Sequence, residues 1–153
     1  MTVCGASLSI ARTVPRPRRT EHTGSVVSRR NSKQIKVGDV LIGGGAPISV
    51  QSMTTTKTED VEATVAEIQR LEEAGCDIVR VAVPHKRDAL VLDQIRSRIK
   101  IPLIADIHFD YRLALMALDA GVDCLRLNPG NIGGRDRVEE VARAAQSRSV
   151  PIR

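Results

Sequence analysis

Aromatic side chains are almost missing from this sequence, whose 153 residues include one Phe, one Tyr and no Trp. A hydrophobic core must therefore be built mainly from aliphatic residues. Long apolar runs are missing too: none approaches the ~20 residues that a membrane-spanning helix requires, so we expect no membrane partner. What is present, 42% hydrophobic and 27% charged residues, is typical of one soluble globular domain.

Cysteine is scarce as well, and Cys4, Cys76 and Cys124 lie far apart in the sequence. No CxxC pair and no Cys/His spacing of a metal site is present in the sequence. The sequence therefore predicts neither a disulfide framework nor a metal site. It predicts reduced thiols in a cytoplasm-like compartment.

Acidic residues are nearly missing from the first 37 residues, which hold eight Lys or Arg and only one acid, Glu21. The rest of the chain carries 15 basic and 17 acidic side chains, so it offers no footprint for nucleic acid. Residues 1–29, rich in Arg, Ser, Thr and Pro without periodicity, are predicted to form a disordered basic leader. An organelle transit peptide has a similar composition and stays open as an alternative.

Residues 30–153 repeat a strand–helix pattern. Two β-rich runs around Gly38-Asp39 predict a hairpin. Four pairs of a strand and a helix follow, with Thr58 as the expected N-cap of the first helix and Gly75 at its end. The expected strands are 46–54, 77–83, 101–107 and 123–128, the expected helices are 58–76, 86–99, 110–121 and 134–148, and "VPIR" begins a fifth strand. Strictly alternating βα units predict a parallel sheet covered by helices.

Side-chain parity within the strands favours a TIM barrel over an open, doubly wound sheet. In "IVRVAV" the valines share one face and leave Arg80 on the other, and in "CLRLN" the leucines leave Arg126 and Asn128. An inner face that becomes polar at the C-terminal mouth is typical of a barrel, and the GxGxxG fingerprint of open dinucleotide-binding sheets is missing. The predicted fold class is therefore an α/β TIM barrel. The sequence holds its N-terminal half, because a complete barrel has eight such units.

Charged residues at the strand ends are the candidates for chemistry. Arg80, Arg126 and Arg153 occupy equivalent places near the ends of three strands, and converging guanidinium groups suit a phosphate-bearing anion. The alternative is that each arginine pairs with an acid such as Asp106 for a structural purpose. Asp106 and His108 are candidates for acid–base work or for contacts to substrate hydroxyls.

The loop "NPGNIGG", which begins at Asn128, adds backbone N–H groups and a helix N-terminus to this candidate anion site. Other residues receive interpretations without a committed role. Ser52 and the threonines at 54–56 serve either the site or the next helix cap, and His85 and Lys86 form a solvated helix start. We expect Met53 in the core, and Cys76 and Cys124 buried with no general base beside them.

Three long stretches resemble one family. They are "APISVQSMTTTKTEDVEATVAEIQRLEEAGCDIVRVAVPHK", "IPLIADIHFDYRLAL" and "GVDCLRLNPGNIGG", and they resemble the N-terminal part of the hydroxymethylbutenyl diphosphate synthase family in order and spacing. The resemblance runs from about Arg30 to Arg153. It implies a TIM-barrel domain followed by a C-terminal domain with a [4Fe–4S] cluster held by three Cys and one Glu, which this sequence lacks.

The resemblance also implies an activity: reductive ring opening of 2-C-methyl-D-erythritol 2,4-cyclodiphosphate in isoprenoid biosynthesis, with electrons from ferredoxin or flavodoxin. The family's diphosphate-binding residues match Arg80, Arg126, Asn128 and Arg153, and no catalytic residue or cluster ligand is assigned here. We expect this piece to be inactive alone, and the full-length protein to be a homodimer in the bacterial cytoplasm, or in a plastid if the leader is a transit peptide.

Two alternatives stay open. One is a barrel transferase similar to dihydropteroate synthase, which also binds a diphosphate in the barrel mouth but needs no metal cluster. The other is a protein without catalytic activity: a half-barrel remnant, or a binding fragment whose basic tail attaches to nucleic acid.

Overall fold

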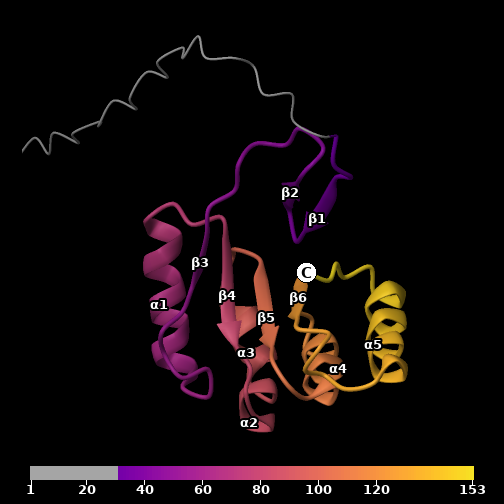
Figure 1. The fold of residues 1–153 in the computed structure, drawn as a ribbon. Helices are drawn as coiled ribbons and strands as arrows, with labels where there is room; N and C mark the ends of the chain where they lie inside the picture. Colours follow the sequence, from indigo (N-terminus) through magenta and orange to yellow (C-terminus); the bar gives the residue numbers. More distant parts are fainter. Residues whose placement is uncertain (1–30) are drawn as a thin grey trace, which may run out of the picture. The chain divides into compact units, whose positions relative to one another are not determined.

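The computed structural model describes residues 31–153 (Figure 1), and the leader predicted for residues 1–29 lies outside the described residues. The chain first forms the predicted antiparallel hairpin, β1 (Ile35–Val37) with β2 (Val40–Ile42). Alternating strands and helices follow: β3 (Gln51–Met53), α1 (Val61–Glu73), β4 (Ile78–Ala82), α2 (Lys86–Ala89), α3 (Leu92–Arg98), β5 (Leu103–Ile107), α4 (Tyr111–Asp119), β6 (Cys124–Leu127) and α5 (Arg135–Ser147). No helix in this described part has the length and apolar character to cross a bilayer.

The sheet is parallel, as predicted, and its strands lie in the order β3-β4-β5-β6. The predicted fifth strand begins beside β6. Ile152 bridges Leu125 in parallel orientation, the Leu127 N–H donates to the Arg153 carbonyl at 2.9 Å, and the Arg153 N–H donates to the Leu125 carbonyl at 2.8 Å. The pairing therefore places Arg153 next to the C-terminal end of β6.

Three details of the predicted elements were wrong. The expected helix 86–99 is divided into α2 and α3, because a tighter turn, in which the Val91 N–H reaches the Asp88 carbonyl, interrupts the α-helical pattern. The N-cap of α1 is Asp60, whose carboxylate accepts from the Ala63 N–H at 3.1 Å. Thr58 is buried instead, and its hydroxyl donates to a carbonyl of β4. The expected strand 46–54 shortens to β3.

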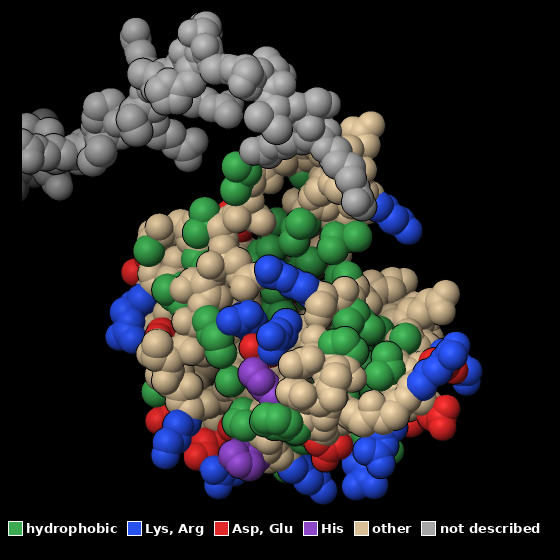
Figure 2. Space-filling view, viewed as in Figure 1, with side chains coloured by type: hydrophobic (Ala, Val, Ile, Leu, Met, Phe, Trp, Pro, Cys, Tyr) green, Lys and Arg blue, Asp and Glu red, His purple; other side chains and the backbone are tan. Residues whose placement is uncertain are grey.

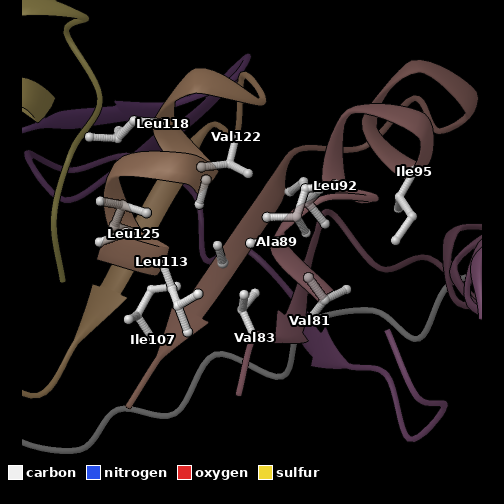
Figure 3. Close-up of a cluster of buried hydrophobic side chains, with 14 of the residues drawn as sticks. Val81, Val83, Ala89, Leu92, Ile95, Ile107, Leu113, Leu118, Val122 and Leu125 are labelled. Atoms are coloured by element: carbon white, nitrogen blue, oxygen red, sulfur yellow. The ribbon is translucent and has the colours of Figure 1, made fainter. Parts of the chain in front are cut away.

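The outer face of the sheet packs against the helices and forms the main core (Figure 3). The valines predicted to share one face of β4 are fully buried there, together with alternate residues of β5 and β6. The helices complete the cluster with Ile68 of α1, Leu92 and Ile95 of α3, and Leu113 of α4. The alternation of buried residues in the strands places the intervening residues on the inner face.

The inner face has an apolar floor. Ile78, Ile104 and Cys124, at or near the first residue of their strands, form a second buried cluster with Val37 of the hairpin. The hairpin lies at the N-terminal ends of the strands (Figure 1), so it covers this end of the inner face. The next residues on the same face of these strands, two positions further along, are charged: Arg80, Asp106 and Arg126.

Gly38, in the hairpin turn, is tied to this covering role. Its φ of +54° lies in the left-handed region, and a Cβ there would lie 2.6 Å from Pro102 Cγ. We expect Gly38→Ala to lower the free energy of unfolding by about 1–2 kcal/mol for the backbone conformation and about 1–3 kcal/mol more for the clash. Denaturant unfolding measures the loss.

Gly45→Ala is the matched control for this prediction. Gly45 also has a positive φ, +84°, but nothing lies within 4 Å of its added Cβ. Only the backbone cost should appear there, so equal losses for the two variants would contradict the close packing of the hairpin turn on Pro102.

Candidate functional site

Two arginines and one aspartate meet on the inner face, one layer above the apolar floor. Arg80 lies on β4, Asp106 on β5 and Arg126 on β6, and the strand register pairs Asp106 directly with Arg126. Each of them alternates with core residues of its strand, so its side chain leaves the helix-covered side. The alternation of residues in the sequence thus predicted that Arg80 and Arg126 share the inner face.

Asp106 is the centre of this group. Its side chain is 4% exposed, and its Oδ1 accepts a hydrogen bond from Arg126 Nη1 at 3.0 Å. Its Oδ2 lies 3.5 Å from Arg80 Nε, and His108 Nε2 lies 3.4 Å from Oδ1. A buried carboxylate requires such partners, and in return it fixes where the two guanidinium groups sit.

The pairing of arginines with Asp106 is the structural role considered from the sequence, yet it leaves most of their donors free. Arg126 uses one of its three guanidinium nitrogens on Asp106, and the remaining ones make no hydrogen bond within residues 31–153. With two arginines around one carboxylate, the group carries a net charge of +1 before His108 is counted. This excess of positive charge favours the binding of an anion.

Arg80 has a second contact, to the residue that ends β3. Its Nη2 lies 3.1 Å from the sulfur of Met53, which is a weak acceptor. The interpretation of Met53 as a core residue therefore missed its contact with the site. The sequence held no signal for it, because a methionine at the end of a strand is far more often core packing.

Arg153, in the segment that pairs with β6, adds a third arginine to this basic surface. Its Nη1 donates to Gln51 Oε1 at 3.1 Å, although Gln51 belongs to β3 at the opposite edge of the sheet. This contact requires a strongly curled sheet, as in a barrel. Viewed on this face, Lys and Arg side chains gather at the centre of the molecule next to a histidine (Figure 2).

His108 and Asn128 occupy the margins of the group. His108 directly follows β5, and its side chain is 41% exposed. Asn128 follows β6 and is half-buried; its carbonyl accepts from the Asn131 N–H at 3.0 Å, and its side chain makes no hydrogen bond within the described range. The role of these residues, and of the three arginines, in binding diphosphate stays a prediction.

Residues 32–153 match a known family. A family model described as the GcpE TIM-barrel domain matches residues 32–153. The chain belongs to this family. The match confirms the predicted family resemblance. It also confirms the predicted fold class, an α/β TIM barrel of which this chain holds only some of the strands.

Curated GcpE relatives carry one name, 4-hydroxy-3-methylbut-2-en-1-yl diphosphate synthase (flavodoxin). The protein of Exiguobacterium sibiricum is 62% identical over 128 residues, which are 84% of this chain and 35% of that protein. The protein of Listeria monocytogenes serovar 1/2a is 63% identical over 127 residues, 83% of this chain and 34% of that protein. The chain thus spans about a third of the length of the curated relatives it matches.

Solved structures share the GcpE fold at low identity. Dihydropteroate synthase of Yersinia pestis superposes with a TM-score of 0.58 at 13% identity, covering 78% of this chain and 44% of that chain. The 7,8-dihydropteroate synthase of Vibrio fischeri gives 0.57 at 11%, covering 79% and 48%. Identities this low show the barrel fold alone, so they lend no support to the transferase alternative.

The two described cysteines of this GcpE chain lack the surroundings of iron–sulfur ligands. Cys76 and Cys124 are buried, as predicted, and Cys76 donates to the Ile78 carbonyl at 3.0 Å. Burial raises the pKa of the Cys124 thiol to about 11, with Arg153 lowering it and Asp123 raising it, so it is not a thiolate at neutral pH. Within residues 31–153 no three His, Cys, Asp or Glu side chains gather as metal ligands, so these residues do not fit the cluster.

Proposed function

We propose that residues 31–153 form the diphosphate-binding side of the barrel mouth in a hydroxymethylbutenyl diphosphate synthase. The observation that carries the proposal is the group of Arg80 and Arg126 held by buried Asp106 at the mouth, with Arg153 on the next strand position. Relatives about 60% identical are named as this synthase, and the name requires a diphosphate site.

The substrate follows from the family resemblance: 2-C-methyl-D-erythritol 2,4-cyclodiphosphate, opened by reduction to 4-hydroxy-3-methylbut-2-enyl diphosphate in isoprenoid biosynthesis. The two phosphates would replace solvent on the free nitrogens of the arginines, and each charge-assisted contact contributes roughly 1.5–3 kcal/mol. Asn128 and His108 would contact the substrate from the margins, with His108 and Asp106 near its hydroxyl groups.

The electrons would come from flavodoxin, the donor in the names of the relatives, rather than from ferredoxin. The [4Fe–4S] cluster that the family implies would supply the electron transfer, with ligands outside the residues described here. The relatives are bacterial, which favours the bacterial cytoplasm over the plastid alternative. The homodimer follows from the family resemblance alone.

A chimera tests this proposal. Residues 32–153 would replace the matching segment of the Listeria monocytogenes synthase, to which this chain is 63% identical. We expect the chimera to convert the cyclodiphosphate with reduced flavodoxin, and the same chimera with Arg80→Ala to lose most of that activity while keeping its cluster absorption. A folded chimera that carries its cluster but forms no product would contradict the proposed function and favour the half-barrel remnant.

A further inference from the structure

In the loop that follows β3, Thr55 and Thr56 are held by a single carboxylate of α1. Glu67 accepts from the Thr55 N–H at 3.1 Å on Oε1 and 3.0 Å on Oε2, from the Thr55 hydroxyl at 2.8 Å, and from the Thr56 N–H at 3.0 Å. Glu67 forms no ion pair with any residue in the described part of the chain. Its hydrogen-bonding capacity is therefore spent on the loop.

Further contacts fix the loop on both sides. The Thr56 and Thr64 hydroxyls lie 2.9 Å apart, and Thr64 Oγ1 donates to the Lys57 carbonyl at 3.1 Å. The Thr58 hydroxyl donates to the Ala82 carbonyl of β4 at 2.6 Å. The loop is thus stapled to helix α1 and to strand β4, although Thr55 and Lys57 are exposed.

The fixed loop leads directly to Arg80. The Thr54 N–H, next to Thr55, donates to the Arg80 carbonyl at 3.0 Å, and Met53, one residue earlier, places its sulfur on Arg80 Nη2 at 3.1 Å. The Thr54 hydroxyl is buried and has no hydrogen-bond partner among residues 31–153. A shift of Thr55 would therefore move Thr54, which contacts the Arg80 carbonyl, and Met53, which contacts the Arg80 guanidinium.

The ionisation of Glu67 suits this task. Partial burial raises the pKa of Glu67, but the hydrogen bonds from Thr55 and Thr56 together lower it by more. The pKa therefore lies below its usual value. The carboxylate is therefore ionised at neutral pH, where it accepts from both N–H groups and the hydroxyl.

We propose that Glu67 is a positioning residue for the diphosphate site: by holding the loop at Thr55 and Thr56, it sets Met53 and Thr54 against Arg80. The proposal rests on the proposed function, because it assigns an affinity effect to that site. Glu67 itself acts through the loop. Glu67 holds the first part of the loop, at Thr55 and Thr56, while threonine hydroxyls hold its later residues.

Glu67→Gln in the 153-residue chain tests the proposal, since it keeps the size of the side chain but turns an NH₂ group toward N–H donors. The probe is inorganic diphosphate, measured by isothermal titration. We expect its Kd to rise about tenfold, as small displacements of binding groups have large effects. Trypsin cleavage after exposed Lys57, detected by mass spectrometry as a new N-terminus at Thr58, should accelerate several-fold.

Glu73→Gln is the matched control, because Glu73 lies on the same helix, is exposed, and makes no hydrogen bond or ion pair with the loop within residues 31–153; Kd and cleavage should stay at the wild-type values. Thr55→Ala removes only the hydroxyl contact with Glu67, so it should raise Kd by a smaller factor. This variant tests the proposal if Glu67→Gln fails to fold.

Two results would overturn the proposal in distinguishable ways. An unchanged Kd in Glu67→Gln, with a lower melting temperature, would show a merely structural carboxylate and leave the proposed function intact. A wild-type chain that binds no diphosphate would contradict the proposed function itself, and with it this assignment.

Discussion

Asp106→Ala is expected to lower the free energy of unfolding by about 2–3 kcal/mol. Removing one partner of a buried ion pair costs about 3–5 kcal/mol, because the remaining charge stays without its counterion. The side chains of Arg80 and Arg126 are 29% and 33% exposed, so water recovers part of that loss and the effect falls below the fully buried range.

Asp119→Ala serves as the control for this prediction. Asp119 also pairs with an arginine, Arg148, but its side chain is 67% exposed, and exposed pairs contribute about 0–1 kcal/mol. Denaturant unfolding of both variants measures the difference. Added diphosphate should restore part of the stability lost in Asp106→Ala, since phosphate oxygens accept from the same guanidinium groups. Equal losses in the two variants would show that Asp106 does not organise the arginines.

Much of the fold was predictable because it depends on periodicity. The repeat of strands and helices, the parallel sheet and the inward position of Arg80 and Arg126 all follow from the order of apolar residues. Pairing of the arginines with Asp106 was considered from the sequence only as an alternative, and nothing in the sequence indicated that one carboxylate would contact both arginines and His108.

Other features were beyond the sequence because contacts between distant residues decide them. Thr58 has a side chain suited to an N-cap, but its hydroxyl donates to the carbonyl of Ala82, 24 residues away. Asp60 caps the helix instead. The contact of Met53 with Arg80 and the hold of Glu67 on the loop likewise join residues whose spacing carries no pattern.

Arg126→Lys is expected to weaken diphosphate binding by about tenfold to a hundredfold with little loss of stability. Lysine keeps the positive charge and can replace the single contact with Asp106, but it loses the planar fork whose free nitrogens would bind the anion. One charge-assisted hydrogen bond contributes roughly 1.5–3 kcal/mol, and 1.4 kcal/mol corresponds to about tenfold in affinity.

Titration of inorganic diphosphate into the wild-type chain and into Arg126→Lys, with melting temperatures measured on the same samples, tests the central claim most directly. Arg148→Lys is the control, because Arg148 pairs with Asp119 at the surface. The anion site predicts wild-type affinity and melting in the control, and weaker binding with nearly unchanged melting in Arg126→Lys. A lower melting temperature with unchanged affinity would contradict the anion site and make Arg126 a structural partner of Asp106.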